Sequence, residues 1–276
     1  MLGKWPGRLF SLVGRRRYID PVNIPAPRRT PLGQTRTRVA ADHAIVGPDS
    51  HVPSPLFGWR DTRGVILVSP AMGARHAMYL ANLTGDSRTD AAPPGIERLV
   101  YVLGGEASLD GQPLAPESFA FLPAGSNYDL RCRGEAELLV FEKRYEPPPE
   151  DAPGLPELHV GKLSDRPAEP FLGDDEARLA TLLPTTPAYD MAVNVFTYQS
   201  GAALPFVETH IMEHGLYMTA GQGVYRLGDH WYPVGGGDAI WMAAYCPQWF
   251  VAMGKQPARY VYYKDVHRNH LPASER

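Results

Sequence analysis

The sequence has few cysteines and no long hydrophobic run. Cys132 and Cys246 are the only two cysteines in 276 residues, too few for the disulfide framework of a small secreted domain. We therefore expect two unpaired thiols and a cytoplasmic protein. No run approaches the ~20 apolar residues that cross a bilayer, and the apolar run at residues 9–13 is too short for the core of a signal peptide. We expect no association with a membrane.

A surplus of positive charge is also absent. The 27 lysines and arginines are outnumbered by 30 acidic residues, which gives a net charge of −3. Such a chain cannot neutralise many phosphates, so a nucleic acid partner is not expected and a small-molecule substrate is. Arginines and prolines are concentrated before residue 35, where the apolar pattern is weak. We expect residues 1–35 to form an N-terminal arm.

The remainder of the sequence is patterned as strands. From residue 64 onward, short apolar or alternating runs are separated about every ten residues by Gly, Pro, Asn or Asp, which is typical of β-sandwiches and β-barrels. This predicts an all-β fold, with one helical stretch at residues 174–183. The expected strands are residues 64–69, 76–83, 99–103, 118–122, 138–143, 191–198, 207–212, 216–219, 223–227, 239–242 and 259–264.

The two halves of the chain carry parallel motifs. Residues 101–105 (YVLGG) correspond to residues 217–221 (YMTAG) at an offset of 116, and residues 121–128 correspond to residues 241–248 at an offset of 120. A proline-rich polar segment separates the halves and reads as a linker. We predict two similar β-barrels in tandem, with an N-terminal domain over residues 36–146, a linker over 147–156 and a C-terminal domain over 157–276.

Glu208, His210 and His214 form the most informative group. On a strand these three residues share one face, so their side chains can converge on one point inside a barrel. One carboxylate and two imidazoles suit a divalent ion such as Mn, Fe, Ni or Zn, and the absence of thiolates argues against a structural zinc site. The group predicts a metal site in the second barrel.

This run, followed by residues 221–225 and 237–242, resembles the paired motifs of the cupin superfamily. The usual cupin pattern places a His in the second motif, and Gln248 stands in its place here. A Glu ahead of two His, a Gln and the ending Tyr-Lys-Asp at residues 263–265 resemble the (S)-ureidoglycine aminohydrolase family. The resemblance extends over about residues 40–268 and implies two tandem cupin (jelly-roll) barrels.

The resemblance also implies an activity. Water would replace the α-amino group of (S)-ureidoglycine, a step of purine and allantoin catabolism that releases ammonia and (S)-ureidoglycolate. The family's metal is manganese, here one Mn²⁺ per chain held by Glu208, His210, His214 and Gln248. A site with one carboxylate ligand has a net charge of about +1, which attracts the carboxylate of a small acid. The family further implies a homo-oligomer.

Two residues are candidates for catalysis, Lys264 and Tyr225. Lys264 shares a strand face with Tyr260 and Tyr262, and the matching residues of the family line the pocket. We assign Lys264 to binding of the substrate carboxylate or to proton transfer, and we leave these roles open. Tyr225 supplies a phenol that can hydrogen-bond the substrate. The full set of substrate-binding candidates is Glu208, Tyr225, Tyr260, Lys264, Asp190 and Asn194.

The repeat indicates which half lacks a metal. Subtracting the offsets from the numbers of the four predicted ligands gives the corresponding positions in the first half. These are Ala92, Pro94, Arg98 and Tyr128, which do not form a set of metal ligands. We therefore expect an N-terminal barrel without metal. Its histidines, among them His43, His51 and His76, are expected to be ordinary surface or core residues.

Two other functions remain open. A Glu and two His with free coordination positions also resemble the site of non-haem iron enzymes, so a cupin oxygenase or isomerase acting on another small acid is one alternative. A non-enzymatic cupin that binds a ligand without turnover is the other. Retention of activity with manganese under anaerobic conditions would exclude the oxygenase, and release of ammonia would exclude the binding protein.

Overall fold

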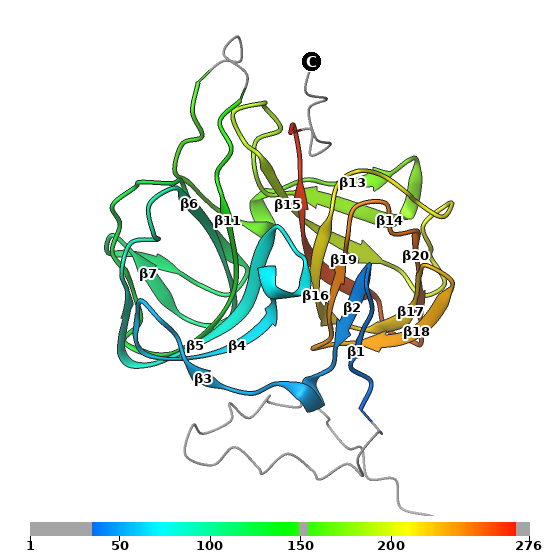
Figure 1. Cartoon of the computed structure of the whole chain (residues 1–276), viewed down its shortest axis with the longest axis horizontal. Helices are drawn as coiled ribbons and strands as arrows, with labels where there is room; N and C mark the ends of the chain where they lie inside the picture. The colour runs from blue at the N-terminus through cyan, green and yellow to red at the C-terminus, as the bar shows by residue number, and fades with distance from the viewer. Residues whose placement is uncertain (1–34, 149–153, 269–276) are drawn as a thin grey trace, which may run out of the picture. The chain divides into compact units, whose positions relative to one another are not determined.

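The computed structural model describes residues 35–148 and 154–268. Within these ranges the chain forms 21 β-strands and three short 3₁₀ helices, η1 (Pro48–Ser50), η2 (Pro70–Met72) and η3 (Leu163–Asp165), and it contains no α-helix (Figure 1). No helix in the described ranges is long and apolar enough to cross a membrane. The expected N-terminal arm, apart from residue 35, and the middle of the expected linker lie outside the described residues.

Ten strands form one sheet, which curls around an apolar core and is called the N-terminal barrel below. The pairing order is β12-β9-β6-β11-β5-β10-β7-β8, and β4 pairs with both β3 and β5. The enclosed core includes Trp59, Val100 and Leu138. The strands are β3 (Ser54–Pro55), β4 (Trp59–Val68), β5 (His76–Thr89), β6 (Ile96–Gly105), β7 (Ala107–Leu109), β8 (Gln112–Leu114), β9 (Ser118–Leu122), β10 (Leu130–Arg131), β11 (Gly134–Arg144) and β12 (His159–Lys162).

The other strands form two sheets that enclose a second core and are called the C-terminal barrel below. An eight-stranded sheet, β1-β2-β19-β16-β21-β15-β14-β13, packs against a three-stranded sheet, β18-β17-β20. The strands are β1 (Arg38–Val39), β2 (His43–Val46), β13 (Ala168–Phe171), β14 (Asp174–Thr181), β15 (Met191–Tyr198), β16 (His214–Ala220), β17 (Gln222–Leu227), β18 (His230–Gly235), β19 (Ala239–Met242), β20 (Gln248–Met253) and β21 (Ala258–Asp265).

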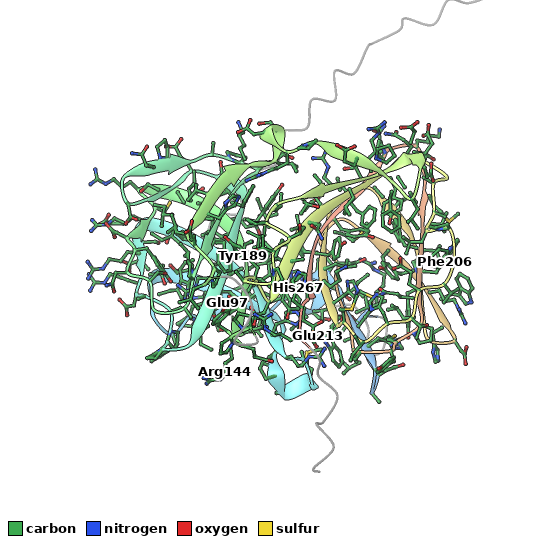
Figure 2. The ribbon with its side chains drawn as sticks, turned by 90° about the horizontal axis from the view of Figure 1, so that it is seen from above. Glu97, Arg144, Tyr189, Phe206, Glu213 and His267 are labelled. Carbon is green, nitrogen blue, oxygen red and sulfur yellow. The ribbon has the colours of Figure 1, made fainter. Side chains whose placement is uncertain are left out.

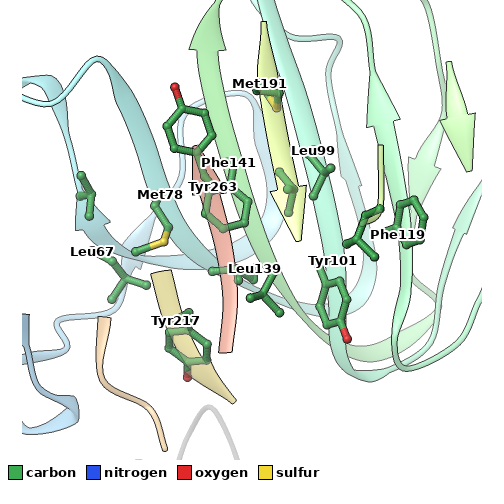
Figure 3. Packing of buried hydrophobic residues seen from close by; sticks show 14 of the residues in the cluster. Leu67, Met78, Leu99, Tyr101, Phe119, Leu139, Phe141, Met191, Tyr217 and Tyr263 are labelled. Atoms are coloured by element: carbon green, nitrogen blue, oxygen red, sulfur yellow. The ribbon is translucent and has the colours of Figure 1, made fainter. Parts of the chain in front are cut away.

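A third core joins the two barrels, and the alternation of side chains along β21 shows how. Tyr260 and Tyr262 belong to the core inside the C-terminal barrel, whereas Val261 and Tyr263 belong to a cluster shared with the N-terminal barrel. Figure 3 shows Tyr263 packed near Phe141 of β11 in that shared cluster. At β21 both faces of the eight-stranded sheet are therefore buried, and successive residues of β21 face different barrels.

Two segments pair with the sheet of the other half. β2 is antiparallel to β19, with Ile45 opposite Ile240, and β12 is antiparallel to β9, with Val160 opposite Ala120. A strand from the start of the chain therefore extends the C-terminal sheet, and a strand that follows the linker extends the N-terminal one. The division into residues 36–146 and 157–276 stays a prediction, and strand pairing crosses it in both directions.

The expected helix at residues 174–183 is wrong. Residues Asp174–Thr181 form β14, which pairs with β13 and with β15. Glu, Ala, Arg and Leu favour a helix locally, but the backbone groups of this segment are used by two neighbouring strands, and Ala177 and Ala180 are buried in the resulting sheet. Pairing and burial outweigh the local propensity.

The expected strand at residues 207–212 is also wrong, since only Glu208 makes a β-bridge and the rest is a loop up to His214. Other expectations hold. β9, β15 and β19 have the predicted bounds, residues 118–122, 191–198 and 239–242. Cys132 and Cys246 are buried and unpaired, as expected.

Candidate active site

A cavity of about 100 Å³ lies inside the C-terminal barrel. Seven of the predicted site residues line it, namely the four predicted ligands together with Lys264, Tyr225 and Tyr260. Asp190 and Asn194 are not among the lining residues. The complete lining is Phe171, Phe196, Leu204, Glu208, His210, His214, Leu216, Tyr225, Gln248, Tyr260, Tyr262 and Lys264.

Backbone pairing holds the four predicted ligands in place. Glu208 and Gln248 are opposite each other in an antiparallel bridge, with the hydrogen bonds Glu208 N to Gln248 O at 2.8 Å and Gln248 N to Glu208 O at 2.9 Å. His214 is the first residue of β16 and pairs with Lys264 of β21. His210 lies in the loop, where its carbonyl oxygen accepts a hydrogen bond from Tyr245 N at 2.7 Å. Three segments far apart in the sequence, residues 208–214, Gln248 and Lys264, therefore meet at one cavity.

Three side-chain nitrogen atoms converge in this cavity. His210 Nε2 lies 3.0 Å from His214 Nε2 and 3.1 Å from Gln248 Nε2. Ligand atoms at right angles around one ion lie about 3 Å apart when the bonds are about 2.1 Å long. A half-turn of the Gln248 amide would bring its oxygen to the same point. This spacing fits a divalent ion.

The protonation of the two histidines fits as well. His210 Nδ1 lies 3.1 Å from the carbonyl oxygen of Met212, which can only accept, so Nδ1 carries a proton and Nε2 is the nitrogen that remains for an ion. Burial, followed by the nearby His210 and Lys264, lowers the pKa of His214 well below its usual range. The His214 imidazole is therefore neutral, the state that a metal requires of histidine.

Glu208 differs from the other predicted ligands in the distance of its side chain from the two imidazoles. Within residues 35–148 and 154–268, the one group of three His, Cys, Asp or Glu ligand atoms that all lie within 4.8 Å of one another is Asp42, His43 and Cys246. The Glu208 carboxylate therefore lies further than this from at least one of the two imidazoles, and it needs a different rotamer to share an ion with them. Burial raises the pKa of Glu208, while His210 and Lys264 act in the opposite direction.

The group Asp42, His43 and Cys246 is a second possible metal site, although its donors are already engaged. His43 Nδ1 lies 2.8 Å from Asp42 Oδ1, and His43 Nε2 lies 2.8 Å from the Tyr232 hydroxyl. Burial and the charge of Asp42 raise the pKa of the Cys246 thiol to about 11, so this sulfur is protonated at neutral pH and is a poor ligand. None of the three residues lines the cavity.

Lys264 is the nearest cation to the predicted ligands. It projects from β21 into the cavity, and burial lowers its pKa, although Glu208 and Asp265 oppose the shift. Tyr225, Tyr260 and Tyr262 form a wall beside it, and burial raises the pKa of each phenol, so all three are neutral donors or acceptors. The cavity can therefore hold a small anion next to a cation and several hydroxyl groups.

The two weaker substrate-binding candidates have other partners. Asp190 is fully buried and lies 2.5 Å from Lys143 Nζ of the N-terminal barrel, and it accepts a hydrogen bond from Glu146 N at 2.8 Å. Asn194 lies opposite Tyr262 in the β15–β21 register, and its side-chain amide is a hydrogen-bond donor to the Tyr262 hydroxyl. Asn194 can therefore orient a residue of the cavity wall without lining the cavity itself.

Sequence reasoning missed several residues of the wall. Tyr262 stacks on the His214 ring at 5.5 Å, and the alternation that placed Tyr260 and Lys264 on one face of β21 could have included it. Phe171 and Leu204 come from other strands and loops, and no motif marks them. Phe206 precedes Glu208 and is 57% exposed, at the outer end of the C-terminal half in Figure 2.

Comparison with known proteins places these features in a family. The Cupin domain family model matches residues 194–263. The chain is 40% identical to an (S)-ureidoglycine aminohydrolase of Arabidopsis thaliana over 91% of its own length and 85% of that protein. It is 31% identical to an (S)-ureidoglycine aminohydrolase of Escherichia coli over 82% of its own length and 89% of that protein.

A solved structure has a similar fold. A putative glyoxylate-induced protein of Pseudomonas aeruginosa superposes with a TM-score of 0.78 and 28% sequence identity, covering 88% of this chain and 95% of that one. The expected all-β fold with two tandem cupin barrels is confirmed.

Proposed function

The chain belongs to the (S)-ureidoglycine aminohydrolase family, and we propose that Glu208, His210, His214 and Gln248 hold one manganese ion at which (S)-ureidoglycine is hydrolysed. The reaction consumes one water and yields (S)-ureidoglycolate and ammonia. The observation that carries the proposal is that the His214 imidazole and the Gln248 amide lie within 3.1 Å of His210 Nε2, in a cavity that Lys264 also lines.

The ion would be bound by two nitrogen atoms, a carboxylate and an amide oxygen. This oxygen-rich set with two histidines and no thiolate suits manganese. When bound, the ion supplies positive charge that attracts the substrate carboxylate and holds the substrate in one orientation. The group Asp42, His43 and Cys246 is the less suitable site, because the two His43 nitrogens already have partners and the Cys246 thiol is protonated.

The protein's own groups account for the other requirements of the reaction. Lys264 either binds the substrate carboxylate or transfers the proton that the departing amine needs, and the choice between these roles stays open. The buried hydroxyls of Tyr225 and Tyr260 can orient the ureido group by hydrogen bonds. Phe171, Phe196 and Leu216 close the apolar side of the cavity and reduce its contact with water.

Ammonia release tests this proposal. Purified protein loaded with manganese is mixed with freshly generated (S)-ureidoglycine, and ammonia is measured with and without oxygen. We expect manganese-dependent release that is the same in both atmospheres. Release that required oxygen would favour an oxygenase, and tight binding of ureidoglycine without release would favour a ligand-binding cupin. Either result would overturn the proposal.

The proposal includes assembly into at least a dimer in the cytoplasm. The eight-stranded sheet ends on β1 and β13, and such edge strands are commonly covered by a neighbour. Val39 on β1 is 65% exposed, and Phe57 is 99% exposed, as expected for side chains that contact another protein. Light scattering at micromolar concentration measures the mass, and a monomer would contradict this part of the proposal.

A further inference from the structure

His76 is a buried histidine of the N-terminal barrel that contacts three residues of the C-terminal barrel. It is the first residue of β5 and is 1% exposed. Its Nδ1 lies 2.9 Å from Glu213 Oε1, and its ring stacks on Tyr263 with centroids 4.1 Å apart. Its Nε2 has no hydrogen-bond partner among the described residues and lies against Gly215, where a β-carbon would be 2.2 Å away.

The three contacted residues are neighbours of the predicted active site. Glu213 and Gly215 flank the predicted ligand His214, and Tyr263 precedes Lys264. Because side chains alternate along a strand, His214 and Lys264 line the cavity of the C-terminal barrel, whereas Glu213 and Tyr263 contact His76 of the N-terminal barrel. His76 therefore contacts the back of the strands that carry a ligand and the cationic residue.

Glu213 links this contact to a wider network. Its carboxylate accepts hydrogen bonds from Arg75 N at 2.9 and 3.1 Å and from Trp241 Nε1 at 3.3 Å. Its own N–H donates to Asp265 Oδ1 at 2.6 Å, and Asp265 also pairs with Arg75. Glu213 lies at the junction of the two halves in Figure 2. The start of β16 and the end of β21 are thus fixed from the same side.

We infer that His76 is a positioning residue for the metal centre, through which the metal-free N-terminal barrel fixes His214 and Lys264. The inference rests on the proposed function, since it concerns the same cavity. The hydrogen bond to Glu213 fixes the position of the backbone where the loop ends and β16 begins at His214. The His76 ring fills the space beside Gly215, which has no side chain. Without this hydrogen bond, both strand ends could move by a fraction of an ångström, enough to weaken a metal site.

Two substitutions separate the hydrogen bond from the bulk of the ring. His76→Leu introduces an apolar side chain of similar size and removes the Nδ1 donor. The Glu213 carboxylate thereby loses one of its buried hydrogen-bond partners. His76→Asn keeps a donor close to the position of Nδ1 and loses the ring. Lys143→Gln is the matched control, because Lys143 also joins the two barrels through a buried ion pair, with Asp190, away from the cavity.

The readouts are the manganese dissociation constant, measured by electron paramagnetic resonance titration, and the thermal midpoint of the metal-free protein. We expect His76→Leu to raise the dissociation constant about 10-fold or more, and His76→Asn to recover most of that loss. Lys143→Gln should lower the thermal midpoint without changing the dissociation constant. His76→Leu with the dissociation constant of the unaltered protein, or Lys143→Gln with as large a rise as His76→Leu, would overturn the inference.

Two further measurements keep the test decisive. If His76→Leu does not fold, Glu213→Gln keeps the volume and weakens the same hydrogen bond, and an unchanged dissociation constant there would also overturn the inference. His214→Ala shows whether the titrated ion is at the proposed centre. Manganese binding that survives His214→Ala would contradict the proposed function, whereas loss in His214→Ala with full binding in His76→Leu would contradict only the role of His76.

Discussion

Arg98 occupies in the N-terminal barrel the position that His214 occupies in the C-terminal barrel. Arg98 pairs with Glu142 on one side and Leu122 on the other, and His214 pairs likewise with Lys264 and Met242. These registers confirm the offsets of 116 and 120 found in the sequence. Where one barrel has a neutral imidazole beside a lysine, the other has a guanidinium beside a carboxylate.

The Arg98 guanidinium fills the point that corresponds to the metal centre. It lies 2.5 Å from Glu142 Oε1 and 2.6 Å from the Tyr128 hydroxyl, under the ring of Trp59 at 5.1 Å. We predict that Arg98→Met lowers the free energy of unfolding by about 3 kcal/mol, because it leaves a largely buried carboxylate without its partner. Urea unfolding and metal analysis measure the outcome. Manganese should stay at one ion per chain, and its loss would place metal in the N-terminal barrel.

Removing a ligand should separate strong donors from weak ones. His210→Ala and His214→Ala each delete a neutral nitrogen donor and should weaken manganese binding by at least about 10-fold, with a parallel loss of ammonia release. Gln248→Ala should bind manganese more tightly than the two histidine variants, because water can replace an amide oxygen. Its turnover should nevertheless be slower than that of the unaltered protein. Metal analysis beside an ammonia assay checks this. Full metal content in His214→Ala would show that the ligand assignment is wrong.

Lys264 should matter for turnover and not for the metal. Lys264→Met keeps the length of the side chain and removes its positive charge. Activity should therefore fall by about 100-fold, the effect of losing a proton-transfer or positioning group. Manganese content should not change. Lys255→Met is the control, since Lys255 is an exposed lysine just before β21, and it should behave like the unaltered protein. Near-normal activity in Lys264→Met would remove Lys264 from the mechanism.

The Glu97 carboxyl lies fully buried beside Asp190, between the barrels. Burial, followed by the neighbouring carboxylate of Asp190, raises the pKa of Glu97 from 4.5 to about 10. The folded protein therefore keeps a proton that the unfolded chain releases above pH ~4.5. Between these two pKa values, this group makes the free energy of unfolding fall as the pH rises, by at most ~1.4 kcal/mol per pH unit.

Glu97→Gln removes this dependence and keeps a donor for Asp190. We predict that the variant gains stability over the unaltered protein as the pH rises, with the gain at pH 9 exceeding that at pH 6 by roughly 1 kcal/mol or more. Urea unfolding of both proteins at the two pH values gives the difference. A difference that does not vary with pH would mean that Glu97 is already ionised in the folded protein.

The sequence predicts well whatever depends on short-range pattern. The largely apolar runs at residues 191–198 and 239–242 predict the bounds of β15 and β19, because a strand buried on both faces is apolar over nearly its whole length. The ligand group is predicted from residue type together with a shared strand face, and of these two reasons the strand face is wrong. Glu208, His210 and His214 meet at one cavity although most of the segment before His214 is a loop and not the expected strand.

What depends on distant pairing could not be predicted. The segment at residues 174–181 favours a helix locally, and only its neighbours in the sheet, β13 and β15, make it a strand. Asp190 precedes β15 and is predicted from the sequence to bind substrate, yet its carboxylate pairs with Lys143 from the other barrel. His76 is one of several isolated histidines in the sequence, and nothing in its surroundings along the chain indicates that it contacts Glu213.

The exchange of β2 and β12 between the halves bears on how such a chain can descend from a duplicated ancestor. Each half contributes strands to the sheet of the other, so neither half contains a complete set of backbone pairings on its own. If the gene were cut near residue 150, each of the two fragments would lack a strand of its own sheet. The neighbouring strand in that sheet would then be exposed. Calorimetry should accordingly record one cooperative melting peak instead of two, and the two cupins should be inherited, and lost, together.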